Sequence, residues 1–318
     1  MLRRARPGSP QQIQTLYGVA GERRLDEWTI PWLPGYEKSA PVRVGNAAAV
    51  QLQLDIFGEL ADVVTQARKG GLPLAPRRKE VRRVFLDHLS RIWRKPDEGI
   101  WEIRAHPQHF TYSKVMAWVT FDRACKLGED TKGQIQRWKK TAQTIRREVL
   151  KNAVDRKRNC FVQAYGSDRL DASLLLLPIV GFISPADRRM KNTVREIERR
   201  LMYKGFLLRY ETESGIDGLP PGEGAFLACS FWLVDNYLLQ GRMRDAEKLY
   251  QRLVKLANDV GLLAEEYDPR ARRMLGNFPQ AFSHVALVNS GINLMQAATL
   301  MPKRKGHKRP HVVRHREH

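Results

Sequence analysis

Cysteine is scarce in this sequence, and so are long apolar runs. The three cysteines, Cys125, Cys160 and Cys229, lie far apart without CxxC spacing, which argues against a disulfide framework and a zinc site and favours a reducing cytoplasm. The longest apolar run, residues 174–180, contains a proline and is too short to span a bilayer. No hydrophobic segment follows the basic residues 1–8, so we expect no signal peptide. These features predict a cytoplasmic protein that does not enter a membrane.

Motifs of several enzyme classes are also missing. The sequence contains no GxSxG nucleophile elbow, no Walker phosphate loop and no HExxH zinc motif. The glycine-rich segment 218–224 lacks the Lys-Ser/Thr pair that a phosphate loop needs, so we interpret it as a turn that leads into a helix. We therefore expect neither a metal ion nor a cofactor.

Acidic residues are few relative to basic ones. The 318 residues include 34 Asp and Glu against 55 Lys and Arg, a net charge of +21, which raises the question of a nucleic-acid partner. Much of the excess lies at the ends: segment 302–318 alone carries seven Lys or Arg and one Glu. No helix-turn-helix, zinc-finger or RNP motif accompanies the charge. We expect one folded domain over residues 1–301 and a basic disordered tail over 302–318, and specific nucleic-acid binding is disfavoured.

Strand patterns are rare, whereas helical patterns recur along the chain. Glycine and proline are dense in the first 45 residues, which we predict to be a loop. Helices are predicted from Asn46, as N-cap, to residue 69, and over 77–93, 112–127, 132–149, 184–203, 225–240, 243–260 and 281–299. Residues 225–234 are apolar on every face, whereas 243–260 are amphipathic. This alternation predicts an all-α protein with an inner ring of helices inside an outer ring. A helical solenoid is the alternative, but no fixed repeat is found.

Two loop segments place carboxylates beside aromatic residues. In residues 96–104, Trp101 precedes Glu102, and an apolar wall of this kind raises the pKa of a carboxyl group. In residues 261–269, Glu265 and Glu266 are adjacent, so on an extended segment one can face a cleft while the other does not. Cleavage of a glycosidic bond requires such a pair of carboxyl groups. Loop glutamates are common, however, and these residues alone favour an ordinary surface role.

The sequence resembles glycoside hydrolase family 15, which comprises glucoamylases, glucodextranases and bacterial-type trehalases. The resemblance rests on an ordered series of motifs: YGVAGER at 17–23, GY at 35–36, PVRVGN at 41–46, DEGIWE at 97–102, HFTYSKVM at 109–116, GEGAF at 222–226, SFW at 230–232 and EEYD at 265–268. It implies an (α/α)6 barrel and an exo-acting hydrolase that inverts the anomeric centre of an α-glucoside. The substrate would be trehalose, a maltooligosaccharide or a dextran end, a choice that the sequence leaves open.

The resemblance also implies roles for individual residues. Glu102 would be the general acid and Glu265 the general base, while Arg209 would hold the non-reducing glucose and Trp101 would wall the same subsite. The remaining candidates would lie around this centre: the rim-loop residues Tyr36, Arg43 and Asn46, and His109, which is close to Glu102 in the sequence.

One departure from the family pattern affects this expectation. Family members carry an N-terminal β-sandwich and a Trp-x-Arg-Asp loop that grips the terminal glucose, and neither is found in this sequence. We therefore expect a barrel that is incomplete at its N-terminal end, with apolar inner faces left open and little hydrolysis by these 318 residues alone. The alternatives are a catalytically inactive fragment of such an enzyme and a basic helical scaffold that binds acidic partners.

Overall fold

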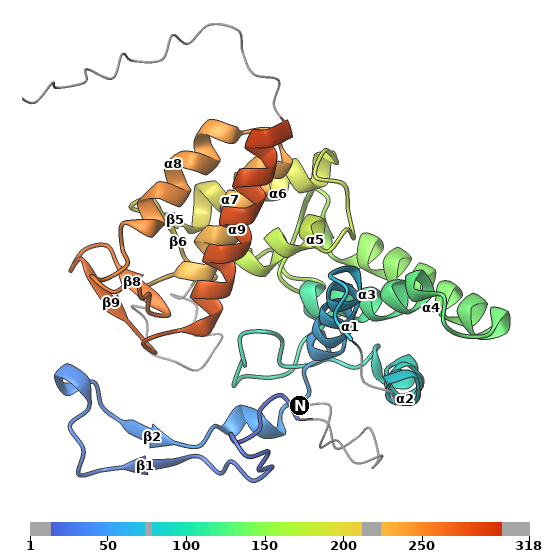
Figure 1. Ribbon diagram of the computed structural model, residues 1–318, viewed down its shortest axis with the longest axis horizontal. Coiled ribbons are helices and arrows are strands. Elements are labelled where there is room, and N and C mark those ends of the chain that lie inside the picture. Colours follow the sequence, from blue (N-terminus) through green and yellow to red (C-terminus); the bar gives the residue numbers. More distant parts are fainter. Residues whose placement is uncertain (1–13, 74–77, 212–223, 301–318) are drawn as a thin grey trace, which may run out of the picture.

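The computed structural model describes residues 14–73, 78–211 and 224–300, and the predicted tail 302–318 lies outside them (Figure 1). The helices are α1 (Asp55–Lys69), α2 (Arg78–Ile92), α3 (Thr111–Leu127), α4 (Lys132–Asn152), α5 (Leu176–Ile179), α6 (Arg188–Leu201), α7 (Leu227–Leu239), α8 (Met243–Val254) and α9 (Ala281–Leu300). Three short 3-10 helices are described, η2 (Tyr36–Lys38), η3 (Ala47–Val50) and η4 (Ala172–Leu175). The all-α prediction is confirmed.

The described strands are short, and all of them pair antiparallel. They are β1 (Trp28–Ile30), β2 (Val42–Val44), β3 (Val154–Asp155), β4 (Cys160–Phe161), β5 (Met202–Tyr203), β6 (Phe206–Leu207), β7 (Ala225–Phe226), β8 (Glu266–Asp268) and β9 (Arg273–Leu275). β1 pairs with β2, β3 with β4 and β5 with β6, while β8 lies between β7 and β9. Most strands thus form local hairpins, whereas the β7–β8 pair joins segments that are separated by α7 and α8.

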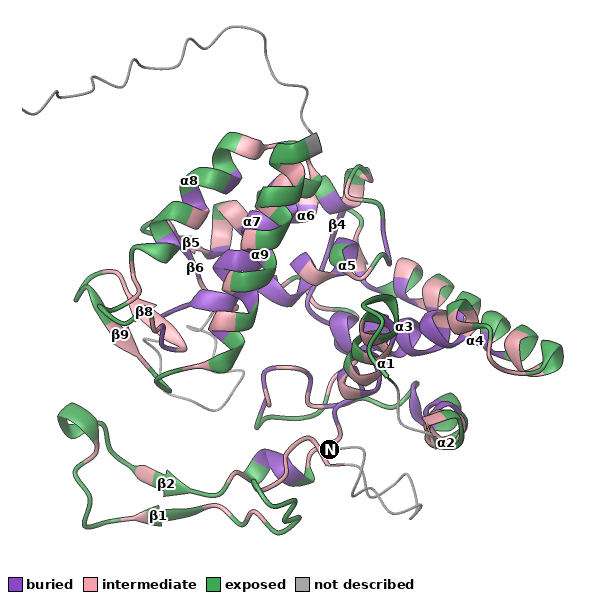
Figure 2. Cartoon of the chain, in the orientation of Figure 1, coloured by how far each residue is buried: buried purple, intermediate pink, exposed green. Residues whose placement is uncertain are grey.

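Two of the helices are buried on all sides along most of their length. Every residue of segment 111–121 in α3 and of segment 227–237 in α7 is buried. α4, α6 and α8 instead bury one face and expose the other, as Figure 2 shows by colour. α4 packs on α3, and α8 packs on α7. A helix that is apolar all round needs neighbours on every side, and α7 has them, whereas the amphipathic α8 covers it from outside. The predicted alternation of buried and amphipathic helices is confirmed.

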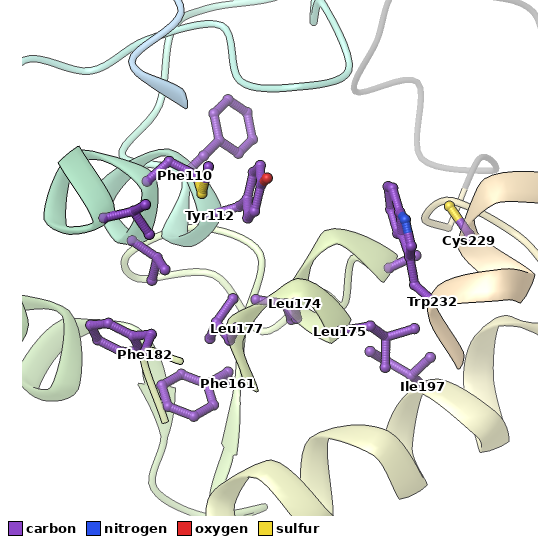
Figure 3. Close-up of a cluster of buried hydrophobic side chains, with 14 of the residues drawn as sticks. Phe110, Tyr112, Phe161, Leu174, Leu175, Leu177, Phe182, Ile197, Cys229 and Trp232 are labelled. Atoms are coloured by element: carbon purple, nitrogen blue, oxygen red, sulfur yellow. The ribbon is translucent and has the colours of Figure 1, made fainter. Parts of the chain in front are cut away.

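The apolar run 174–180 fills the space between the two buried helices. Leu174, Leu175 and Leu177 are fully buried (Figure 3), and η4 and α5, which carry them, contact both α3 and α7. Full burial of one such leucine side chain contributes about 1.5–3 kcal/mol relative to exposure. η4 and α5 therefore join the two halves of the core.

A glycine allows α1 to approach α3 closely. A Cβ atom on Gly58 would lie 2.4 Å from the backbone oxygen of Met116 and 2.8 Å from its Cβ. Any larger residue at position 58 would push the helices apart. This contact matters for the site, because the loops that precede α1 and α3 both border it.

The predicted starts of two helices are wrong. α1 begins at Asp55, and Asn46 instead caps η3, where its Oδ1 accepts a hydrogen bond of 2.8 Å from a backbone N–H of that turn. α6 is capped by Asp187 rather than Ser184, because the aspartate accepts a 2.9 Å bond from a backbone N–H of the first turn. At the start of α6 two residues capable of capping, Ser184 and Asp187, lie three positions apart, and the local side-chain bond decides between them. α8 ends at Val254, earlier than the predicted residue 260.

The first 45 residues are not a loop throughout. In the part that is described, β1 and β2 form a hairpin in which Trp28 lies opposite Val44, and Figure 1 shows it extending beside the helices. Aromatic and β-branched residues supply the strands, but they are few and lie between glycines and prolines, so the strand pattern was too short to recognise.

α9 exposes part of an apolar surface. Val285 and Val288 are each 56% exposed and Met295 is 71% exposed, although this helix is apolar around its circumference. Exposed apolar patches of this kind mark contact surfaces or promote association. None of the described helices combines the length and the hydropathy needed to cross a membrane.

Candidate active site

A tight loop between α2 and α3 carries Glu102. Asp97 opens the loop and is buried, and its Oδ2 accepts a 3.1 Å bond from the backbone N–H of Leu54. An isolated bridge joins Asp97 to Gln108, so both ends of the loop are fastened together. Inside the loop, the amide of Gln51 donates to the carbonyl oxygen of Glu102 at 3.3 Å. The segment before α1 and the bridge between the two ends of the loop thus fix this loop.

The backbone of Glu102 adopts a left-handed conformation. Its φ is 54°, which is uncommon for a residue with a side chain and persists only where surrounding contacts hold it. The side chain is half-buried, and burial is the main cause of the raised pKa of its carboxyl group. A hydrogen bond with Asn46 and the charge of Arg209 act in the opposite direction, whereas the charge of Glu265 raises the pKa further. The expected direction of the shift at Glu102 is therefore confirmed.

Trp101 forms a buried wall beside Glu102. Its indole packs edge-on against Phe226 with ring centroids 5.3 Å apart and lies 6.0 Å from the ring of Trp232. The guanidinium of Arg209 lies 5.9 Å from the centre of the indole and 4.8 Å from the ring of Tyr210. Trp101 and Arg209 therefore come from distant segments and meet beside the same carboxyl group.

Glu265 lies directly before β8 and is held by the loop that follows β9. Its Oε2 accepts two hydrogen bonds from Asn277, one from the backbone N–H at 3.1 Å and one from Nδ2 at 3.0 Å. Gly276 has a φ of 72°, and a Cβ atom there would lie 2.8 Å from the same Oε2. The side chain of Glu265 thus rests on a glycine and an asparagine that the sequence did not single out.

The two adjacent glutamates point to different partners. Glu266 belongs to β8, and its Oε2 accepts a 3.0 Å bond from the backbone N–H of Gly224, whereas Glu265 is held by Asn277. Successive side chains of a strand point to opposite faces, which explains the difference. The segment was expected to be an extended loop, and it is instead the start of the β8–β9 hairpin.

The β1–β2 hairpin is attached to both carboxylate segments. Glu27 forms a two-pronged ion pair with Arg104, at 2.8 and 3.0 Å, and a longer one with Arg43, at 3.6 Å. At the far end of the hairpin, Glu37 pairs with Arg273 of β9. The hairpin therefore contacts both the loop that carries Glu102 and strand β9, which follows Glu265 in the sequence.

Of the rim residues expected from the sequence, only Asn46 contacts one of the two candidate catalytic carboxyl groups among the contacts that the structure describes. Asn46 bonds to Glu102, and Arg43 pairs with Glu27. Tyr36 is 77% exposed. His109 stacks on Tyr165 with ring centroids 5.7 Å apart.

A family model of glycosyl hydrolases family 15 matches residues 3–292. The chain belongs to this family. It is 42% identical over 287 residues to the trehalase of Mycobacterium tuberculosis, a match that covers 90% of this chain and 42% of that protein. It is 37% identical over 289 residues to the trehalase of Thermoplasma volcanium, covering 90% of this chain and 46% of that protein. The chain thus spans less than half the length of these curated relatives.

Solved structures share the fold of this family 15 chain. A glycosidase variant in complex with glucose superposes with a TM-score of 0.66 at 20% identity, covering 83% of this chain and 74% of that one. The glucoamylase from Saccharomycopsis fibuligera gives a TM-score of 0.62 at 11% identity, covering 78% and 70%. At identities this low the comparison shows the fold alone, and that fold agrees with the expected (α/α)6 barrel.

Several residues of this family 15 site were not found by sequence reasoning. Asn277 holds Glu265, and Asp171 accepts the indole N–H of Trp101. Asp55, the first residue of α1, is buried, and burial together with the charge of Asp97 raises its pKa to about 8, so it is neutral near pH 7. No spacing of residues in the sequence indicates these contacts, because each residue and its partner are brought together only when the chain folds.

Two hollows lie away from both glutamates. One is lined by apolar residues of α1, α2 and α3 together with Arg78, Arg82 and Arg123, and the other lies at the ends of α1 and α3. A small cavity of about 220 Å³ lies directly behind Trp101 and is lined by Asp171 and Gln163. Among the described residues we find no cluster of three or more His, Cys, Asp or Glu side chains suited to a metal ion.

Proposed function

We propose that the protein to which this chain belongs hydrolyses trehalose with inversion at the attacked anomeric carbon. The observation that carries the proposal is that Glu102 and Glu265, 163 residues apart in the sequence, lie near enough for the charge of Glu265 to raise the pKa of Glu102, in a chain that is 42% identical to a trehalase. Glycosidic hydrolysis needs such a pair on opposite sides of the bond.

Glu102 acts as the general acid. Burial beside Trp101 raises its pKa and thereby favours the protonated form, which donates its proton to the glycosidic oxygen as the bond to the anomeric carbon breaks. The hydrogen bond from Asn46 moderates the rise and orients the carboxyl group. The departing sugar leaves as neutral α-glucose.

Glu265 acts as the general base. Asn277 occupies Oε2 with two N–H donors, and we assign Oε1 to the attacking water. The water loses a proton to Oε1 while its oxygen bonds to the anomeric carbon from the β face, giving β-glucose. This reaction requires the two carboxyl groups to be about 6.5–9.5 Å apart, so that a water molecule fits between them.

Arg209 and Trp101 bind the glucose unit at the non-reducing end. The guanidinium supplies donors for sugar hydroxyls and the indole a flat apolar wall, and the two lie 5.9 Å apart. Tyr36, Arg43 and Asn46 lie on the rim formed by the β1–β2 hairpin and η3. A glycosidase of the same fold has been solved with glucose bound, which supports a glucose-binding site in this fold.

The products of trehalose hydrolysis test the mechanism. With inversion, the first products measured by proton NMR are α- and β-glucose in equal amounts, whereas retention gives only α-glucose. Initial formation of α-glucose alone would refute the role of Glu265 as base. Comparison with maltotriose and isomaltose tests the assignment of the substrate. Faster hydrolysis of either sugar would show that trehalose is not the preferred substrate, without affecting the proposed inverting mechanism.

A further inference from the structure

Asp171 lies directly behind Trp101 and is only 2% exposed. Its carboxylate accepts the indole N–H of Trp101 on both oxygens, each at 2.9 Å. It also accepts a 2.7 Å bond from the backbone N–H of Ser173 and a 3.2 Å bond from the side-chain amide of Gln163. A buried carboxylate is costly unless it is paired or hydrogen-bonded, and these three donors meet that need.

The backbone around Asp171 is tied to the segment that carries Arg209. Asp171 forms an isolated antiparallel bridge with Tyr210, and the backbone N–H of Ala172 donates to the carbonyl oxygen of Arg209 at 2.8 Å. One short segment thus holds the indole through a side chain and the arginine through the main chain. The indole and the guanidinium, 5.9 Å apart, are therefore placed relative to each other from a common point.

We propose that Asp171 is a positioning residue that fixes the plane of the Trp101 indole and thereby the place of Glu102 relative to Arg209. The inference rests on the proposed function. The indole has a single donor, so a carboxylate that receives it on two oxygens restrains both the position and the rotation of the ring. The competing explanation is that Asp171 merely caps η4 through its bond with the N–H of Ser173.

The variant Asp171→Asn separates the two explanations. An amide oxygen in the place of Oδ1 can keep the cap bond from Ser173, but the NH₂ group in the place of Oδ2 then faces two other donors, the indole N–H of Trp101 and the side-chain amide of Gln163, and displaces the ring. We expect kcat for trehalose to fall about 100-fold, the size of effect that a displaced catalytic group produces. The alkaline limb of the kcat profile should move to lower pH, because a displaced indole admits water to Glu102 and lowers its pKa. Asp187→Asn, at the cap of α6, is the matched control and should change neither.

A double-mutant cycle with Trp101→Phe shows whether Asp171 acts through the indole. Phenylalanine removes the N–H donor, so adding Asp171→Asn to that variant should have little further effect on kcat. A second loss of about 100-fold, equal to the loss in the wild-type background, would show that the two residues act independently and would overturn the proposal.

A measurement of the indole N–H keeps this inference separate from the proposed function. In two-dimensional ¹H–¹⁵N NMR spectra, the Trp101 side-chain signal, assigned as the one missing in Trp101→Phe, should shift and exchange faster with solvent in Asp171→Asn but not in Asp187→Asn. An unchanged signal in an active enzyme overturns the positioning role alone. A wild-type protein that cleaves no α-glucoside overturns the proposed function and the catalytic part of this inference, while the signal still reports the contact.

Discussion

Replacing Glu102 with glutamine tests the central step of the proposed reaction. Glu102→Gln preserves the size of the side chain and its ability to bond with Asn46, but it removes the transferable proton. The left-handed backbone at this position is held by neighbouring contacts, including the bond from Gln51, rather than by the carboxyl group. We therefore expect the fold to remain intact and the chemistry to be lost.

The magnitude follows from the need for a proton in the transition state. General acid catalysis contributes about 10²- to 10⁴-fold to the rate, which corresponds to about 2.7–5.4 kcal/mol of transition-state stabilisation at 1.36 kcal/mol per tenfold. We expect kcat for trehalose to fall by that factor when the substitution is made in the whole protein to which this chain belongs. With α-glucosyl fluoride, whose leaving group needs no proton from an acid, the loss should be about tenfold or less.

The pH profile and a neighbouring variant complete the assay. In the wild type, kcat should decline as pH rises through the pKa of Glu102, because the acid must be protonated, and burial places this limb above the pKa of an ordinary glutamate. That limb should vanish in Glu102→Gln. Glu98→Gln, in the same loop, is the matched control and should keep the limb. Equal loss on both substrates, or a large loss only in the control, would refute the assignment of Glu102.

Three further changes test the surroundings of the two carboxyl groups and the outer layer. Asn46→Asp keeps the cap of η3 but replaces the amide donor with a negative charge, so the pKa of Glu102 and the alkaline limb of kcat should rise; a lower limb would contradict the hydrogen bond. Gly276→Ala places a Cβ atom 2.8 Å from Oε2 of Glu265 and should reduce kcat about 100-fold, and unchanged kinetics would show that Glu265 does not depend on this position. Thr131→Ala removes the capping box of α4 and should lower the free energy of unfolding by about 1 kcal/mol in urea, without changing kcat.

The helices were predictable because the positions that a helix buries are apolar, and their spacing is visible in the sequence. α7 is apolar at almost every position, and α4 repeats Trp138, Ala142, Ile145 and Val149 on one face, the residues that the structure buries. Their ends were harder to place. Asn46 and Asp187 are both good caps, and only the path of the chain decided that the first begins a 3-10 turn and the second begins α6.

The two carboxylates were found through their motifs, but what holds them was not. Asn277 and Asp171 lie 12 and 70 residues from the side chains that they hold, and no periodicity relates such positions. Their contacts depend on hairpins and helix ends that bring separate segments together. A short pattern such as DEGIWE can locate Glu102 along the chain but cannot show which side chains surround it.

The left-handed backbone of Glu102 illustrates how the fold supplies what the motif lacks. A residue with a side chain in this region costs about 1–3 kcal/mol and is retained only where other contacts overdetermine it. Here the bridge between Asp97 and Gln108 closes the loop, Gln51 binds its carbonyl oxygens, and Asp171 holds the adjacent indole. These contacts come from segments before α1, before α3 and at η4, so the position of the carboxyl group depends on the packing of all three. Weakening any one of them should therefore relax the loop and alter catalysis more than it alters the stability of the fold.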